Sequence, residues 1–217
     1  MFTIRTPKIV ATGLLAGFAA LSMSACTTSN NVVANVAKAA FEDRLAEEQV
    51  IDAKIKAAAL DRLLSVDKVL VVDINIDVWK THVMASGTLS DTSLHHKATA
   101  ALRQDGRIAR LYDEVQIVSA DAQSERREWK EKAQATAQKT ADKAAEVFDD
   151  FWIETKISAQ LIAADGIKSV NYRWRSVLGT VYLLGEAQSA QELNLVKHII
   201  KNIKGVRALT THVQLRG

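Results

Sequence analysis

The sequence predicts an α+β fold: two small sandwiches, each with the order helix, strand, strand, helix, strand, joined by a long helical linker. Two observations lead to this prediction. A helical pattern followed by two alternating apolar segments occurs once in each half of the chain. The segment between the copies is rich in Ala, Lys, Glu and Gln and contains neither Gly nor Pro. The expected boundaries for processing segment, tether, first unit, linker and second unit are 1–25, 26–40, 41–121, 122–150 and 151–217.

Residues 1–25 have the pattern of an export signal. Arg5 and Lys8 form a short positive region, and an apolar stretch without charge follows over 9–22. Met23-Ser-Ala-Cys26 then places small residues before the only cysteine of the chain. This segment resembles a lipobox, although lipoproteins usually have Leu where Met23 stands. A lone cysteine in an exported protein has no disulfide partner, and lipidation of Cys26 explains it; the alternative is a plain secretory signal.

Lipidation of Cys26 predicts a protein held at a membrane and facing the periplasm. Each buried methylene contributes about 0.8 kcal/mol, and lipoproteins of this kind resemble three-chain anchors. Thr27 follows the cysteine, and in enterobacterial-type sorting a residue other than Asp there favours the outer membrane. Loss of Arg5 and Lys8 with the signal lowers the formal net charge from +3 to +1. Export and this near-neutral charge make nucleic acid an unexpected partner.

Each unit opens with a helix of matching sequence. Ile51-Asp-Ala-Lys-Ile55 in the first copy corresponds to Ile153-Glu-Thr-Lys-Ile157 in the second. An alternating run follows each helix, over 72–78 and 170–174, and a period of two indicates a half-buried strand. The first copy has a few more residues between helix and strand, around 63–70, which we expect to form an extra turn or loop.

A second strand ends in glycine in both copies, at Gly87 and Gly185. From these glycines onward the copies align without a gap, with helices expected over 90–104 and 189–203 and last strands over 112–118 and 209–215. Two amphipathic helices covering one face of a three-stranded sheet would make each unit a small α+β sandwich.

This pattern resembles the BON domain, and two copies behind a lipobox resemble the dual-BON outer-membrane lipoproteins. The residues that carry the resemblance are Trp152-Ile-Glu-Thr-Lys156, Val181-Tyr-Leu-Leu-Gly185, Ile203-Lys-Gly-Val-Arg207 and Thr210-Thr-His-Val213. The first copy departs at its close, where Arg107 stands at the position of Gly205. The resemblance implies that the second domain binds anionic phospholipid and that its opening helix enters the bilayer through the Trp at the position of Trp152.

Aromatic residues gather where the second unit begins, at Phe148, Phe151 and Trp152, and Lys156 follows one turn later. A Trp ring at headgroup depth with an ammonium group beside phosphate forms an interfacial anchor. We therefore expect phospholipid contact by Trp152, with Ile153, Lys156, Trp174 and Arg175 as its neighbours.

The alternative interpretation places Trp152 in the core. Ile153 and Ile157, spaced by four, are better core candidates. They would turn Trp152 about 100° away from Ile153, since a helix has about 3.6 residues per turn.

Formal charge differs between the two units. Residues 41–122 contain ten Lys or Arg and fourteen Asp or Glu, a net of −4, whereas residues 151–217 contain nine and four, a net of +5. A basic unit beside a membrane is expected to meet anionic headgroups, each Lys or Arg contributing about 1 kcal/mol at most. Ordinary solubility charge is the alternative. The acidic first unit is expected to be a structural module or to contact envelope proteins.

The linker, residues 122–150, consists of good helix formers. We expect one helix that continues into the second unit and ends near Ala163. It serves as a solvated spacer, or alternatively as a self-association surface along an apolar stripe of Trp129, Ala133, Ala137 and Ala144.

The sequence shows no catalytic constellation: no nucleophile motif, no paired-cysteine site and no glycine-rich phosphate loop. His95-His96 lies on a predicted helix, where adjacent side chains are expected to point in different directions. We expect no enzymatic activity, no metal and no cofactor. The expected function is a non-enzymatic envelope lipoprotein that binds anionic phospholipid and supports outer-membrane integrity. A periplasmic protein-interaction or chaperone-like stress protein is the alternative.

Overall fold

The structure is a computed structural model, and it describes residues 42–137 and 150–217. The predicted signal, the predicted lipidation site Cys26, the predicted tether 26–40 and the linker residues 138–149 lie outside this range. Among the residues described, no helix combines the length and the hydropathy that a membrane span requires.

Unit 1, residues 46–117, has the predicted order of elements. It consists of α2 (Ala46–Val66), the short helix α3 (Leu70–Asp73), β1 (Ile74–Trp79), β2 (His82–Leu89), α4 (Thr92–Leu102) and β3 (Arg110–Ile117). The extra residues predicted around 63–70 are not found, and the predicted match of Ile51–Ile55 with Ile153–Ile157 is wrong. Asp52 accepts the N–H groups of Lys80 and Thr81 as Asp150 accepts those of Leu178 and Gly179, so Asp52 and Asp150 are equivalent and lie 98 residues apart, as Gly87 and Gly185 do. The opening helix of the first unit is therefore longer at its start, and the distance from the equivalent aspartate to the first strand is the same in both units.

Unit 2, residues 150–215, repeats this order. It consists of α6 (Asp150–Ala163), the 3-10 turn η1 (Ser169–Asn171), β4 (Tyr172–Val177), β5 (Thr180–Ala187), α7 (Ala190–Lys201) and β6 (Ala208–Leu215). Its opening helix ends at Ala163, where the sequence predicted the end.

Each unit contains one three-stranded sheet, in the order β1-β2-β3 or β4-β5-β6. The first two strands form an antiparallel hairpin, and the third lies parallel to the second after a crossover through α4 or α7. Each crossover helix has the side-chain cap its sequence indicates: Asp91 accepts the N–H groups of Ser93 and Leu94, and Ser189 accepts that of Glu192.

The predicted glycines allow a close backbone approach in each unit. A Cβ atom on Gly87 would lie 2.0 Å from the carbonyl oxygen of Asp73, and one on Gly185 would lie 2.2 Å from that of Asn171. The backbone just before the first strand therefore passes against the second strand, and only glycine leaves the necessary space. Asp73 and Asn171 are accordingly equivalent positions of the repeat.

Each unit covers one face of its sheet with helices. The opening helices bury residues spaced by four: Ile55, Ala59 and Leu63 in α2, and Ile153, Ile157 and Leu161 in α6. These side chains meet the strand residues of the same face, including Val83 and Ala85 in unit 1 and Val181 and Leu183 in unit 2.

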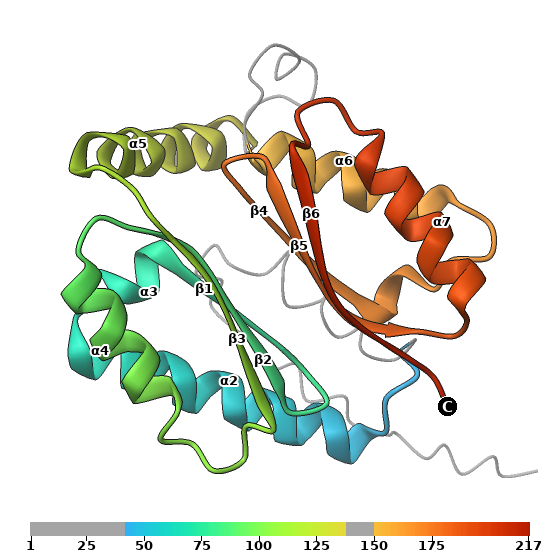
Figure 1. Ribbon diagram of the computed structural model, residues 1–217, viewed down its shortest axis with the longest axis horizontal. Helices are drawn as coiled ribbons and strands as arrows, with labels where there is room; N and C mark the ends of the chain where they lie inside the picture. Colours follow the sequence, from blue (N-terminus) through green and yellow to red (C-terminus); the bar gives the residue numbers. More distant parts are fainter. Residues whose placement is uncertain (1–41, 138–149) are drawn as a thin grey trace, which may run out of the picture.

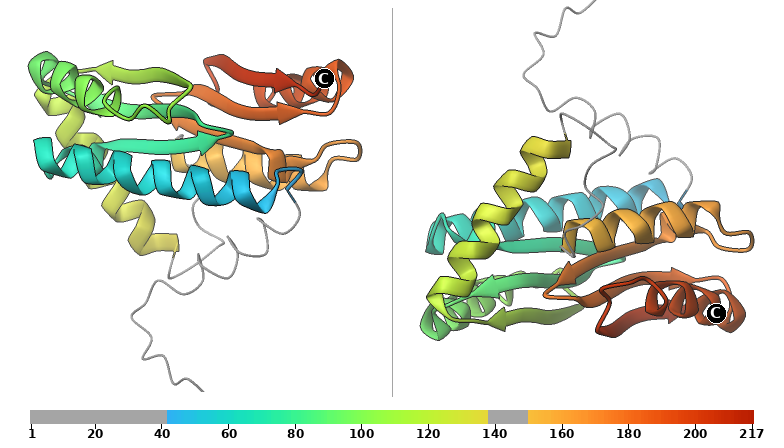
Figure 2. Two further views of the ribbon diagram at one scale, coloured as in Figure 1. Left: turned by 90° about the horizontal axis from the view of Figure 1, so that it is seen from below. Right: turned by 90° about the horizontal axis from the view of Figure 1, so that it is seen from above.

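The other faces of the two sheets pack against each other (Figure 1), so the molecule has four layers, with helices outside and two sheets inside. A separate apolar cluster fills this sheet-to-sheet interface: Trp79, Met84, Val177, Tyr182 and Leu184. Here β1 contacts β5 and β2 contacts β4. Strand β1 is equivalent to β4, and β2 is equivalent to β5. The first strand of each unit thus contacts the second strand of the other, which is the pattern that a two-fold axis between the units produces. Figure 2 shows α2 and α6 toward one side of the molecule and α4 and α7 toward the other.

The described part of the linker is the helix α5 (Ala120–Ala137). Its first turns are docked, because Gln123 is buried and its Nε2 donates to Asp73 at 2.6 Å and to the carbonyl of Thr88 at 3.2 Å. Arg127 also binds Asp73, and Arg126 binds Asp150 of unit 2. A solvated spacer is therefore the wrong description of these first turns. For the rest of the linker, the spacer and self-association both stay predictions.

Candidate functional site

Ile153 lies in the core of unit 2 and not on its surface. It is 1% exposed and packs in one cluster with Ile157 and Leu161. The prediction that Ile153 neighbours a bilayer is therefore wrong, since it reaches no membrane while unit 2 is folded.

Arg175 lies between the units, so its predicted place in a membrane patch is also wrong. Its Nε and Nη2 groups donate to the Asp77 carboxylate at 2.7 and 3.0 Å, and its Nη1 lies 3.6 Å from Oε2 of Glu154. Burial alone would lower the pKa of Arg175, but Asp77 and Glu154 hold it above its ordinary value. Its neighbour on β4, Trp174, points to the other sheet face, packs against the unit 2 core and donates from Nε1 to the Glu154 carbonyl at 3.3 Å.

Trp152 has an intermediate position. It is half-buried at the edge of the unit 2 core, and the Lys156 ammonium lies 5.2 Å from the centroid of its ring. This is cation–π geometry, and Lys156 itself is exposed. Trp152 thus combines features of both predicted alternatives, core packing and a surface beside a cation.

Two exposed apolar side chains lie beside Trp152 at the end of unit 2 that carries the β4–β5 turn. Phe151 is 46% exposed and Leu178, in that turn, is 41% exposed. The Asp150 carboxylate accepts the N–H groups of Leu178 at 2.8 Å and Gly179 at 2.9 Å, which ties the turn to the start of α6. Burial alone would raise the pKa of Asp150, but the Gly179 N–H, the Ser176 hydroxyl and Arg126 hold it below its ordinary value.

The fold brings basic residues to the same end. The N–H of Arg207 donates to the Gly179 carbonyl at 2.7 Å, and a Cβ on Gly179 would lie 2.9 Å from the carbonyl oxygen of Gly205. The exposed Lys204 and Arg207 therefore flank the turn. We call Phe151, Trp152, Lys156, Leu178, Lys204 and Arg207 the hairpin-end patch. Sequence reasoning missed Lys204, Arg207 and Leu178, because only the packing of the turn against the segment before β6 brings them to α6.

Many of the basic residues of unit 2 form ion pairs with acidic residues of unit 1 or of the segment before α2. Of the nine basic residues in 151–217, four form ion pairs with acids of 41–122: Lys168 and Arg216 with Asp43, Arg173 with Glu42, and Arg175 with Asp77. The histidine His212 adds a fifth contact, 2.6 Å from Glu114. The other five basic residues, Lys156, Lys197, Lys201, Lys204 and Arg207, belong to α6, α7 and the segment before β6.

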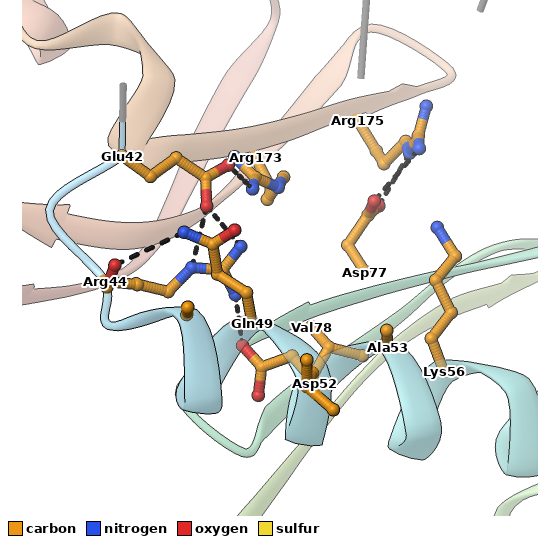
Figure 3. A pocket seen from close by; sticks show the side chains of 12 residues that line it. Glu42, Arg44, Gln49, Asp52, Ala53, Lys56, Asp77, Val78, Arg173 and Arg175 are labelled. Atoms are coloured by element: carbon orange, nitrogen blue, oxygen red, sulfur yellow. Dashed lines mark hydrogen bonds and ion pairs between the residues drawn. The ribbon is translucent and has the colours of Figure 1, made fainter. Parts of the chain in front are cut away.

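A cleft of about 860 Å³ lies between α2 and β4, next to these ion pairs. Figure 3 shows Arg44 between Glu42 and Asp52, Arg173 on Glu42, and Arg175 on Asp77. Each arginine that lines the cleft thus binds a carboxylate. The charged side chains of the cleft therefore hold the two units together by ion pairs.

The two adjacent histidines do not point apart. The rings of His95 and His96 lie 5.9 Å from each other and are nearly parallel, so the expectation of different directions is wrong. His95 Nε2 lies 2.9 Å from the Asp113 carboxylate. Within residues 42–137 and 150–217, no group of three or more His, Cys, Asp or Glu side chains is arranged to hold a metal ion.

Unit 2 is a BON domain: this family matches residues 149–217, which include all of α6 to β6. The chain is also 31% identical over 143 residues to the "Uncharacterized protein in gshII 5'region" of Anaplasma centrale, over 66% of this chain and 82% of that protein. The chain belongs to the same family as this protein.

Two solved structures of CdsD, a structural protein of the type III secretion system of Chlamydia trachomatis, show a distant likeness. One is 10% identical with a TM-score of 0.29, and it covers 74% of this chain and 91% of that one. The other, of the C-terminal domain, is 12% identical with a TM-score of 0.31, and it covers 74% and 96%. Likenesses of this size say nothing about what the chain does.

Proposed function

We propose that the chain is a non-enzymatic envelope lipoprotein, anchored through Cys26 at the outer membrane and facing the periplasm. Its BON domain binds anionic phospholipid and so supports outer-membrane integrity. BON domains are commonly associated with phospholipid binding or with envelope proteins, and that association supports the proposal. Unit 1, which has the same order of elements, acts as a second BON-type module with a structural or protein-contacting role.

The hairpin-end patch is the observation that carries this proposal. Exposed Phe151 and Leu178 supply apolar surface for the headgroup and acyl boundary. Trp152 beside Lys156 is the pair of groups that membrane interfaces favour. Lys204 and Arg207 add positive charge at the same end, where anionic headgroups would lie.

Unit 1 has no such combination at its corresponding end. Its β1–β2 turn carries Lys80 where unit 2 has Leu178, and the Lys80 ammonium binds Glu186 of unit 2 at 2.6 Å. The residue before that turn, Trp79, is buried between the sheets. These differences support a proposal that limits phospholipid binding to unit 2.

A protein-binding role is the second candidate, and one observation favours it. Leu45, Val50 and Ile51 are exposed at the start of α2, where an apolar client segment would find a surface. This surface belongs to unit 1 and is distinct from the hairpin-end patch.

The test is flotation of residues 27–217 with vesicles of phosphatidylglycerol or of phosphatidylcholine alone. We compare the parent with Phe151→Ser and with the pair Lys204→Glu and Arg207→Glu. The matched controls are Leu64→Ser, which removes an exposed apolar side chain of unit 1, and the pair Lys54→Glu and Lys68→Glu. We expect flotation on phosphatidylglycerol only, lost in the patch variants and kept in the controls.

Two results would contradict the proposal. Absence of flotation on both vesicles would leave the lipid anchor as the membrane contact and favour the protein-binding role. Equal losses in patch and control variants would show that net charge and hydropathy, and not the patch, determine binding.

A further inference from the structure

The short segment before α2 lies on unit 2, although unit 1 follows it in the chain. The Asp43 carboxylate is surrounded by donors of unit 2 and its C-terminal end. Asn171 Nδ2 donates to it at 2.8 Å, Gln188 Nε2 donates at 2.9 Å, and Arg216 Nη1 lies 3.1 Å away. The Lys168 ammonium completes the set. We call these four residues the Asn171 socket.

Asn171 binds two groups of Asp43 through its side chain, the backbone N–H and the carboxylate. Its side chain is essentially buried, with 1% of the residue exposed, and its Oδ1 accepts the backbone N–H of Asp43 at 3.1 Å while its Nδ2 donates to the carboxylate. An acidic residue within a peptide presents an N–H group beside its carboxylate, and these are the two groups that Oδ1 and Nδ2 bind here. The socket therefore fits an acidic residue within a peptide.

Glu42 and Arg44 extend the contact to the interface between the sheets. The Glu42 carboxylate is buried between Arg44 and Arg173, and Arg44 also binds Asp52 (Figure 3). The guanidinium carbons of Arg44 and Arg173 lie 4.4 and 5.2 Å from the centroid of the Trp79 ring. Residues 42–44 thus close the end of the interface over a buried tryptophan.

In unit 1, the position equivalent to Asn171 also binds a residue from outside the repeat. That bound residue is basic in unit 1, whereas Asp43, which binds at Asn171, is acidic. Asp73 corresponds to Asn171, since each carbonyl oxygen faces the matching glycine, Gly87 or Gly185. Arg127 of α5 donates from Nε to Asp73 at 2.9 Å, beside the bond from Gln123. In both units, a segment from outside the repeat docks at the residue that precedes the first strand.

We propose that this position is a peptide-docking socket of the repeat whose charge selects its occupant, and that the acidic segment 42–44 is the occupant of the Asn171 socket. Docking attaches the chain that leads to the N-terminal region directly to unit 2, and it clamps the two units together over Trp79. This role is independent of phospholipid binding, which uses the opposite end of unit 2.

Electrostatics agree with the geometry. Burial alone would raise the pKa of Asp43, but hydrogen bonds from Lys168, Gln188 and Asn171 hold it well below its usual range. The Asp43 carboxyl group is therefore ionised more readily than an ordinary aspartate, as the donors of the socket require.

The experiment changes the charge of the bound residue, Asp43, and of the residue that binds it, Asn171, in the chain of residues 27–217. Asp43→Arg and Asn171→Asp are made singly and together, because the pair reproduces the Arg127–Asp73 arrangement of unit 1. Hydrogen exchange of the amides of residues 42–46 is measured by mass spectrometry. Exchange within β5 serves as the internal reference for global folding, and Glu47→Arg, at an exposed acid of the next turn, is the control.

We expect each single variant to accelerate exchange at 42–46 by about tenfold or more, with β5 unchanged. The double variant should recover part of the protection that Asp43→Arg loses, because Lys168 and Arg216 still repel an arginine at position 43. Glu47→Arg should stay at the parent rate. The proposal is overturned if the single variants leave this exchange unchanged, or if the double variant is no better protected than Asp43→Arg alone. If a single variant also accelerates exchange in β5, the decision rests on recovery by the double variant.

Discussion

Asp77 and Arg175 occupy equivalent positions in the two units and bind each other across the interface. Asp77 pairs with Met84 in the first hairpin, and Arg175 pairs with Tyr182 at the same place in the second. The guanidinium meets the carboxylate in a bidentate contact of 2.7 and 3.0 Å. A residue that touches its own equivalent lies next to the two-fold axis that relates the units.

Glu114 and His212 repeat this relationship on the third strands. Glu114 faces Ser86 in β2 and His212 faces Leu184 in β5, and the carboxylate lies 2.6 Å from His212 Nε2. Two copies of unit 1 placed around the same axis would bring Asp77 against Asp77 and Glu114 against Glu114. The Asp77–Arg175 ion pair and the Glu114–His212 hydrogen bond therefore favour pairing of unit 1 with unit 2 over pairing of two copies of unit 1.

The first prediction tests this axis. Asp77→Arg leaves two guanidinium groups facing each other, and we expect a loss of about 3 kcal/mol in the free energy of unfolding, because breaking a buried pair leaves an uncompensated charge. Exchange of both residues, Asp77→Arg with Arg175→Asp, should recover at least half, the remainder being lost because the exchanged carboxylate lies near Glu154. Urea unfolding of the three variants measures both effects. An exchange variant no more stable than Asp77→Arg alone would show that the pair is not coupled.

The alternation of the strands predicted the helix-facing core but not the sheet-to-sheet interface. In β5, Tyr182 and Leu184 occupy the face that alternation assigns to solvent, and both are buried against unit 1. Apolar residues on both faces of a strand indicate burial on both sides. That signal was present in Val181-Tyr-Leu-Leu, yet what covers the second face depends on the other unit. The charges of −4 and +5 were a second signal of this docking, which the sequence alone left open to a membrane interpretation.

The part of the candidate site that lies in one stretch of the chain was predictable from the sequence. The part that comes from distant segments was not. Phe151 and Trp152 are neighbours in the chain, and their clustering is visible in the sequence. Lys204 and Arg207 reach them only because β6 runs parallel to β5 and begins beside the β4–β5 turn. Arg175 was misplaced because alternation does not say which face of β4 meets the other unit.

The second prediction concerns the close backbone approach in unit 2. Gly185→Ala places a Cβ 2.2 Å from the carbonyl oxygen of Asn171 and 3.0 Å from the Cα of Tyr172, and both of these are backbone atoms. We expect a loss of about 3 kcal/mol or more, or failure to fold, because overpacking against backbone is not relieved by a rotamer change. Gly106→Ala is the matched control, since its Cβ would meet nothing within 4 Å. Thermal unfolding of both variants measures the difference, and similar melting temperatures would contradict the steric explanation.

The third prediction separates core from surface at the start of α6. Ile153→Ala empties a fully buried position and should cost about 2–5 kcal/mol of unfolding free energy. Trp152→Ala removes a half-buried ring and should cost clearly less while abolishing binding to phosphatidylglycerol vesicles. Chemical unfolding and flotation are measured on the same samples. If Trp152→Ala were the more destabilising change, the ring would belong to the core and not to the patch.

The last prediction concerns Glu154, whose carboxylate lies beside the Asp77–Arg175 pair. Burial raises its pKa above the ordinary 4.5, and Asp77 and Asp150 add to the rise, against the opposing effects of Arg175 and the Ser176 N–H. A carboxyl with a raised pKa in the folded protein is more easily ionised in the unfolded chain, so its ionisation reduces stability as pH rises. At pH values below the ordinary 4.5, the carboxyl group is protonated in both the folded and the unfolded chain, and this penalty vanishes.

Glu154→Gln should therefore raise the melting temperature at pH 7, because the amide keeps an acceptor for the Ser176 N–H, now bonded at 2.9 Å, without carrying a charge. The gain should shrink as pH falls and disappear near pH 4. Melting temperatures of parent and variant between these pH values measure the effect, with Glu47→Gln as an exposed control on α2. A gain that is independent of pH, or a loss at pH 7, would mean that the contact with Arg175 outweighs the burial of the charge.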